Sequence, residues 1–155
     1  MSGIVLLWVG RRAPGAWEEL AEEYRRRIAR LAEFAEVRLR PEEGRAGDRG
    51  RVVRREAARV REFLKEGDTL IVLDERGREV TSEQLAERLA ARRAGGRVVL
   101  VVGSDLGLDE PLRHEAQEVW ALSRLTFPHL LARVVVLEQL FRALDTAAGG
   151  SYHRP

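Results

Sequence analysis

Residues 122–129 read Leu-Ser-Arg-Leu-Thr-Phe-Pro-His, and the chain ends with the tail Gly149-Gly-Ser-Tyr-His-Arg-Pro155. Two of the three histidines lie in these stretches. Between them, apolar residues recur at the spacing of one helix face: Val134, Leu137, Phe141 and Leu144. The sequence therefore predicts a long terminal helix between two polar stretches, and it assigns the upstream chain to the sheet and helices that support them.

Upstream, short apolar runs alternate with amphipathic segments. Ile4–Val9, Thr69–Leu73 and Val98–Val102 are nearly unbroken apolar runs, as interior strands of a parallel sheet require. Phe34–Leu39 largely alternates apolar and charged residues and predicts a half-exposed strand, and Val119–Leu122 predicts a last strand. The pattern is typical of one α/β domain with a mostly parallel sheet and helices on both faces.

The segments between these runs predict helices. Apolar residues at helical spacing mark 17–31 and 53–64. Thr81–Gln84 forms a capping-box pattern at the start of a third helix, and Asp109 is suited to cap a short fourth one. The segment Glu42–Gly50 is rich in glycine and charge, and we interpret it as a mobile loop.

Composition limits the classes of protein to consider. At 155 residues, 45% hydrophobic and 34% charged, the chain suits one soluble domain, and no apolar run approaches the roughly 20 residues of a membrane span. The N-terminus reads as a short strand rather than a signal peptide, so we expect a cytoplasmic protein. The absence of cysteine excludes disulfides, thiolate catalysis and cysteine-based zinc sites.

Basic charge is concentrated in the first half of the chain. Residues 1–65 carry 16 basic and 11 acidic side chains, whereas residues 66–155 carry 11 and 14. The stretch from Arg38 to Arg61 alone holds nine arginines and four acids. Loop and helix together can follow a nucleic-acid backbone, and a solvated helix face is the alternative.

Three predicted strand ends carry the candidate chemistry, because ligands of open α/β sheets bind beyond the carboxyl ends of the strands. They are Leu73-Asp74, Gly103–Leu108 and Leu122–His129. Gly103-x-x-x-Gly107 is neither a dinucleotide fingerprint nor a P-loop, and a plain turn would use the same glycines. The histidines are too scattered to suggest a metal, and no serine has a nucleophile-elbow context.

One ordered set of residues runs through the C-terminal third: Leu122-Ser-x-Leu-Thr-x-Pro-His129, Arg133, Glu138-Gln139-Leu-Phe-Arg-Ala143 and Tyr152-His-Arg154. This set resembles the bacterial ribosomal RNA large-subunit methyltransferase H family, whose members are pseudouridine N3-methyltransferases of the SPOUT superfamily. The likeness covers the whole chain. It implies a SPOUT-type fold with a C-terminal trefoil knot that involves the segments from Gly103 onward, an S-adenosylmethionine cofactor, large-subunit ribosomal RNA within the ribosome as substrate, and a homodimer.

The resemblance also implies the site. Cofactor-binding positions would be Leu73, Gly103, Ser104, Gly107, Leu122, Ser123, Arg124, Leu125, Thr126, Phe127, Pro128 and His129. The tail of one subunit would complete the site of the other. One departure stands out, because the family often has Gly-Gly-Pro where this chain has Gly103-Ser104-Asp105. Ser104 can serve there if its φ angle is one that a non-glycine residue holds.

Methyl transfer to an imide nitrogen requires that its proton leave, and a base and a nearby cation assist this. We expect His153 to accept or relay the proton, Arg154 and Arg142 to stabilise charge, and Tyr152 to position the RNA base. His129 is expected to shape the cofactor pocket, with helix capping or a solvent-facing ring as the alternative. Three other readings stay open: a SPOUT methyltransferase for another ribosomal or transfer RNA base, a non-catalytic RNA-binding or ribosome assembly factor, and a small-ligand α/β domain.

Overall fold

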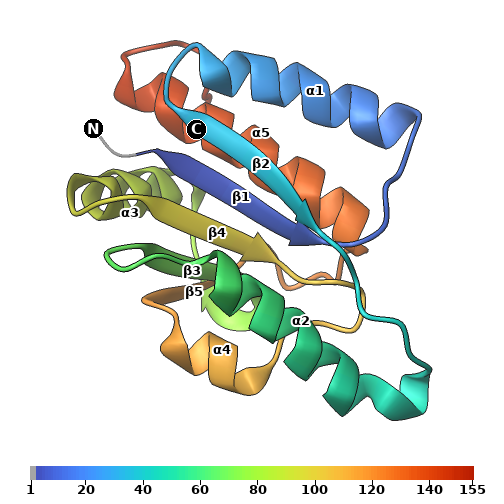
Figure 1. The fold of residues 1–155 in the computed structure, drawn as a ribbon. Coiled ribbons are helices and arrows are strands. Elements are labelled where there is room, and N and C mark those ends of the chain that lie inside the picture. The colour runs from blue at the N-terminus through green and yellow to red at the C-terminus, as the bar shows by residue number, and fades with distance from the viewer. Residues whose placement is uncertain (1–2) are drawn as a thin grey trace.

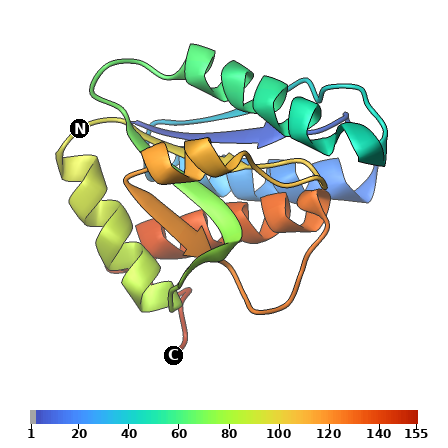
Figure 2. The same cartoon turned by 90° about the horizontal axis from the view of Figure 1, so that it is seen from below.

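A five-stranded sheet crosses the molecule between two layers of helices (Figures 1 and 2). The computed structural model describes residues 3–155. In the sheet the strand order is β2-β1-β4-β3-β5, and within the described residues every neighbouring pair of these strands is parallel. The strands are β1 (Ile4–Val9), β2 (Phe34–Leu39), β3 (Thr69–Glu79), β4 (Val98–Val102) and β5 (Glu118–Ala121). The predicted α/β class is therefore confirmed.

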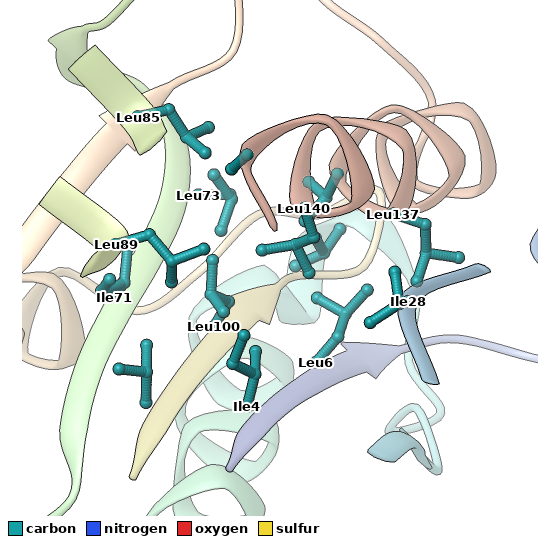
Figure 3. Close-up of a cluster of buried hydrophobic side chains, with 14 of the residues drawn as sticks. Ile4, Leu6, Ile28, Ile71, Leu73, Leu85, Leu89, Leu100, Leu137 and Leu140 are labelled. Atoms are coloured by element: carbon teal, nitrogen blue, oxygen red, sulfur yellow. The ribbon is translucent and has the colours of Figure 1, made fainter. Parts of the chain in front are cut away.

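The helices divide between the two faces of the sheet (Figure 1). One face is covered by α1 (Ala16–Ala29), α3 (Ser82–Ala94) and α5 (His129–Ala147), and the other by α2 (Arg49–Phe63) and α4 (Glu110–Glu115). Because successive side chains of a strand point to opposite faces, each buried strand serves two cores. Figure 3 shows the first core, in which Leu6 of β1 and Leu100 of β4 lie under Leu137 and Leu140 of α5.

Sequence patterning explains most of these elements. All six residues of β1 and all five of β4 are buried, as their unbroken apolar runs predict for central strands. The capping box of α3 is formed, because Thr81 accepts the backbone N–H of Gln84 at 3.0 Å and Gln84 accepts that of Thr81 at 2.9 Å. No helix within residues 3–155 has both the length and the apolarity that a membrane span needs.

Two predicted boundaries were wrong. The third strand does not end at Leu73 but continues to Glu79, because β5 pairs with it on both sides of a register shift between Leu73 and Arg78. The segment Glu42–Gly50 is not a loop throughout, since a 3₁₀ turn spans Ala46–Asp48 and α2 begins at Arg49. Charged residues interrupt the apolar pattern at both places, so hydropathy alone did not show that the strand and the helix extend there.

Candidate active site

A cavity of about 520 Å³ lies at the carboxyl end of β4, beside residues 73–76 of β3 and the segment that follows β5. It brings together eleven of the twelve residues expected to hold the cofactor: Leu73, Gly103, Ser104, Gly107, Leu122, Ser123, Leu125, Thr126, Phe127, Pro128 and His129. Arg124 is the exception. Its side chain is 87% exposed and lies 3.6 Å from Glu79, outside the cavity wall.

The segment Gly103–Leu108, termed here the glycine loop, needs glycine at two positions. A Cβ atom on Gly103 would lie 2.7 Å from the Leu108 side chain, and Gly107 has a φ of 86°. Ser104 needs no such freedom, because no non-glycine residue within residues 3–155 has a positive φ. The departure from Gly-Gly-Pro is therefore compatible with this backbone.

Asp105 connects the glycine loop to the start of α5. Its Oδ1 accepts the backbone N–H of His129 at 3.0 Å and lies 2.8 Å from the ring Nδ1 of His129. Pro128, at the N-cap, makes no side-chain cap, so Asp105 supplies that acceptor from a distant loop. The hydrogen bond from the His129 backbone, together with the nearby imidazole, holds the pKa of Asp105 below its usual value.

The ring of His129 is enclosed rather than solvent-facing. Its side chain is 17% exposed and stacks on Trp8, with ring centroids 6.3 Å apart. A Cβ atom on Gly10 would come within 2.6 Å of the ring Nε2, so glycine at that position makes room for the imidazole. The geometry supports a role for His129 in forming the cavity wall.

Charged residues that the sequence did not assign to the site also line the cavity. Arg76 donates to Asp74 at 3.0 and 3.1 Å, and Thr126 donates its hydroxyl to Glu75 at 3.0 Å. Burial raises the pKa of Asp74, but the hydrogen bonds and charge of Arg76 outweigh it and leave the pKa below its usual value. Arg49 at the start of α2 also faces the cavity. Of these charged residues, the sequence pointed only to Asp74, which follows the predicted end of the third strand.

The predicted catalytic residues form a separate cluster, termed here the tail cluster, in which the C-terminal tail packs against side chains of α5 and α3. Tyr152 donates its hydroxyl to Glu138 at 3.1 Å, and the guanidinium of Arg142 lies 4.9 Å from the centre of the Tyr152 ring. His153 contacts Arg142 through Nδ1 at 3.0 Å and Glu83 through Nε2 at 2.9 Å. The exposed residue Arg154 follows. None of Arg142, Tyr152, His153 or Arg154 lines the cavity of its own chain.

The neighbours of His153 define its tautomer. A carboxylate only accepts hydrogen bonds, so Nε2 carries a hydrogen toward Glu83, whereas a guanidinium only donates, so Nδ1 presents its lone pair to Arg142. Tyr152 is not a candidate base, because the hydrogen bond with Tyr24, burial and Glu138 all raise its pKa. The basic atom of this cluster is therefore Nδ1 of His153, and Arg142 covers it.

Within residues 3–155, no group of three or more His, Cys, Asp or Glu side chains is arranged to hold a metal ion.

The family model described as a predicted SPOUT methyltransferase matches residues 3–153. Two relatives bear the name ribosomal RNA large subunit methyltransferase H. The protein from Methylobacterium sp. (strain 4-46) is 43% identical over 97% of each chain, and that from Gloeobacter violaceus is 40% identical over 97% of each.

A solved structure shares the fold. It is a putative methyltransferase of Legionella pneumophila in complex with bound S-adenosylmethionine, with a TM-score of 0.52 and 11% sequence identity. The match covers 94% of this chain and 66% of that protein. At this identity the likeness concerns the fold alone.

Proposed function

The chain belongs to the ribosomal RNA large subunit methyltransferase H family of SPOUT methyltransferases, and from this premise we propose that it transfers a methyl group from S-adenosylmethionine to N3 of a pseudouridine in large-subunit ribosomal RNA. The observation that carries the proposal is the cavity, which gathers the glycine loop at the carboxyl end of β4, residues 73–76 of the neighbouring strand β3 and the 122–129 segment. This is where ligands of parallel α/β sheets bind.

The cavity suits the cofactor. Its volume falls within the range of roughly 300–1,000 Å³ for small-molecule sites. The approach of Gly103 to Leu108 leaves no room for a side chain, so cofactor atoms would meet backbone groups of the glycine loop. Leu73, Phe127 and Pro128 supply apolar wall, and Ser123 and Thr126 supply hydroxyl groups. When bound there, S-adenosylmethionine supplies the electrophilic methyl group.

The family fold also implies the trefoil knot from Gly103 onward, and we include it in the proposal. Two of the segments concerned, the glycine loop and 122–129, line one cavity. The bond from His129 to Asp105 joins them directly. A threaded chain would hold these segments together without help from the cofactor.

Unpaired arginines near the cavity support an RNA substrate. Arg11 and Arg12 are exposed after Gly10, the glycine that packs on His129. Arg54 and Arg55 of α2, the helix whose first residue Arg49 lines the cavity, are exposed and make no hydrogen bond or ion pair within residues 3–155. Three other arginines of α2, Arg51, Arg59 and Arg61, form ion pairs with acids, as in the 2.7 Å pair of Arg59 with Glu42. Exposed positive charge is therefore available for phosphates after Gly10 and along α2.

The position of the tail cluster supports a homodimer. A proton acceptor must lie within hydrogen-bonding reach of the reacting nitrogen, yet His153 does not line the cavity of its own chain. We propose that the tail of the partner subunit supplies it. In this arrangement Arg142 turns from His153 toward the pseudouridine, Nδ1 of His153 takes the N3 proton, and Arg154 stabilises charge on the flanking carbonyl oxygens. Tyr152 positions the base.

A methyl-transfer assay tests the proposal. Purified protein is incubated with labelled S-adenosylmethionine and either ribosomes from a strain lacking the enzyme or bulk transfer RNA. Label is expected in large-subunit RNA, on a pseudouridine identified by mass spectrometry. Label in transfer RNA would favour another SPOUT substrate. A calorimetric titration with no heat from S-adenosylmethionine would instead favour the non-catalytic RNA-binding factor.

A further inference from the structure

A buried carboxylate outside the cavity lining carries a further inference. Glu56 of α2 is 1% exposed, and no cation pairs with it within residues 3–155. Most buried carboxylates are paired, because an isolated charge loses its hydration without compensation. Glu56 must therefore depend on its hydrogen-bond donors. Loss of either donor would leave a buried acceptor unsatisfied, which is costly.

The two donors come from two different parts of the molecule. The Ser104 hydroxyl of the glycine loop donates to Oε1 at 2.8 Å, and the backbone N–H of Glu42 donates to Oε2 at 3.0 Å. Glu42 begins the segment 42–61, termed here the arginine segment, and its own carboxylate binds Arg59 at 2.7 Å. One buried group thus joins the glycine loop to the segment that we expect to meet RNA.

A second contact reinforces this connection. Nε of Arg49, in the first turn of α2, donates to the backbone oxygen of Leu106 in the glycine loop at 3.1 Å. In Figure 2, α2 lies over the chain that follows β4. The glycine loop is therefore held from the arginine segment at two places, one of them buried.

We propose that Glu56 is a positioning residue that couples cofactor binding in the cavity to the conformation of the arginine segment. This inference rests on the proposed function. A ligand that orders the glycine loop holds the Ser104 hydroxyl in place. Through their hydrogen bonds, Ser104 then orients the Glu56 carboxylate, and the carboxylate orients the backbone at Glu42. By reciprocity, a polyanion that orders the arginine segment favours the loop conformation that binds the cofactor.

Calorimetric titration of S-adenosylmethionine into four proteins tests the positioning role: the wild type, Glu56→Gln, Ser104→Ala and the double variant. Each single change is expected to lower affinity about tenfold, the usual worth of one hydrogen bond to a charged group. The double variant should bind no more weakly than the weaker single variant, because the two side chains act through one bond. Glu62→Gln, the same change on an exposed residue of α2, is the matched control and should bind like the wild type.

Hydrogen exchange tests the coupling itself. Saturating S-adenosylmethionine should slow exchange of amides in 42–50 in the wild type and in Glu62→Gln. In Glu56→Gln it should slow exchange in 122–129 only. A residue that merely stabilises the fold would change exchange with and without the cofactor alike.

The outcomes separate the two proposals. Wild-type protein that releases no heat with S-adenosylmethionine would refute the proposed function and this inference with it. Wild-type binding with additive effects of Glu56→Gln and Ser104→Ala, or with unchanged protection of 42–50, would refute the inference alone. Additive effects would mean that Ser104 acts on the cofactor directly. If Glu56→Gln fails to fold, the measurements are made on Ser104→Ala. This change removes the same Ser104–Glu56 hydrogen bond, but at a side chain that is only partly buried.

Discussion

Arg133 is the residue that joins the cavity wall to the core. It lies on α5 with 2% of its side chain exposed, and its Nε and Nη2 atoms each bind Glu36 at 2.6 Å. Its guanidinium stacks 4.4 Å from the centre of the Trp8 ring, and Trp8 in turn stacks on His129. The guanidinium of Arg133 is thus buried against Glu36 of β2. Through Trp8 it also supports the His129 ring in the cavity wall.

Replacing Arg133 tests this pair. We expect Arg133→Met to lower the free energy of unfolding by about 3 kcal/mol, the lower end of the range for breaking a buried ion pair, because the buried carboxylate of Glu36 keeps only its pair with Arg25. Urea denaturation measures the change. Arg26→Met, which removes an arginine that is 62% exposed, is the control and should cost less than about 1 kcal/mol. The variant that also carries Glu36→Gln should recover part of the loss, and no recovery would show that Arg133 acts through packing alone.

The tail cluster gives a second prediction for a single residue. His153→Ala should lower the rate of methyl transfer by about a hundredfold or more, as expected for loss of a proton acceptor. The dissociation constant of S-adenosylmethionine should change less than twofold, because His153 lies outside the cavity. Single-turnover kinetics and calorimetry measure the two quantities. His114→Ala, at a histidine whose side chain is 73% exposed, should alter neither, and full turnover by His153→Ala would exclude it as the base.

The sequence predicted the residues that line the cavity better than the buried charged residues that hold this lining in place. Leu122–His129 was identified as one motif, and all of it except Arg124 lines the cavity. Glu56 reads as an ordinary charge on an amphipathic helix, and Arg133 was identified only as part of the family motif. Neither was predicted to be buried, and both are. Their partners lie 48 and 97 positions away in the chain, so no local pattern could show the burial. The roles proposed for Arg142, Tyr152, His153 and Arg154 stay predictions.

The pairing of β3 with β5 depends on one glycine. Gly77 lies within the register shift, and a Cβ atom there would be 2.7 Å from both the backbone carbon and the oxygen of Val119. The apolar pattern alone could not predict this part of the strand, because Asp74–Arg78 contains no apolar residue. The close backbone approach, rather than hydropathy, lets the strand continue.

Gly77→Ala should therefore destabilise the protein by about 1–3 kcal/mol, because backbone rather than a flexible side chain must move. Thermal denaturation measures the effect. Gly47→Ala is the matched control, since a Cβ atom at Gly47 meets nothing within 4 Å. A melting temperature for Gly77→Ala equal to that of the control would show that β5 can shift away without cost.

The start of α5 should be sensitive to acid. The pKa of Asp105 is lowered in the folded state, so its contribution to stability is complete above the unfolded value of about 3.9 and is lost as pH falls through the folded value. Asp105→Asn should be less stable than the wild type at pH 7, and the difference should shrink as the pH approaches 2. Urea titrations across this range measure it, and a constant difference would mean that the carboxylate charge plays no part.

At the scale of the whole molecule, the separation between the cavity and the tail cluster predicts complementation between subunits. His153→Ala keeps an intact cavity and loses the proton acceptor. Gly107→Val keeps the tail and should lose the cofactor, because a β-branched residue is strained at a φ of 86°. Each variant alone should be inactive.

Mixing the two under conditions of subunit exchange should restore activity, because the cavity of one variant meets the tail of the other in a mixed dimer. Random exchange makes half of the dimers mixed, each with one complete site, so about a quarter of wild-type activity is expected. Native mass spectrometry verifies that exchange occurred. Mixed dimers without activity would show that each tail serves its own chain, and the tail would then have to leave Glu83 and Arg142 and cross to the cavity alone.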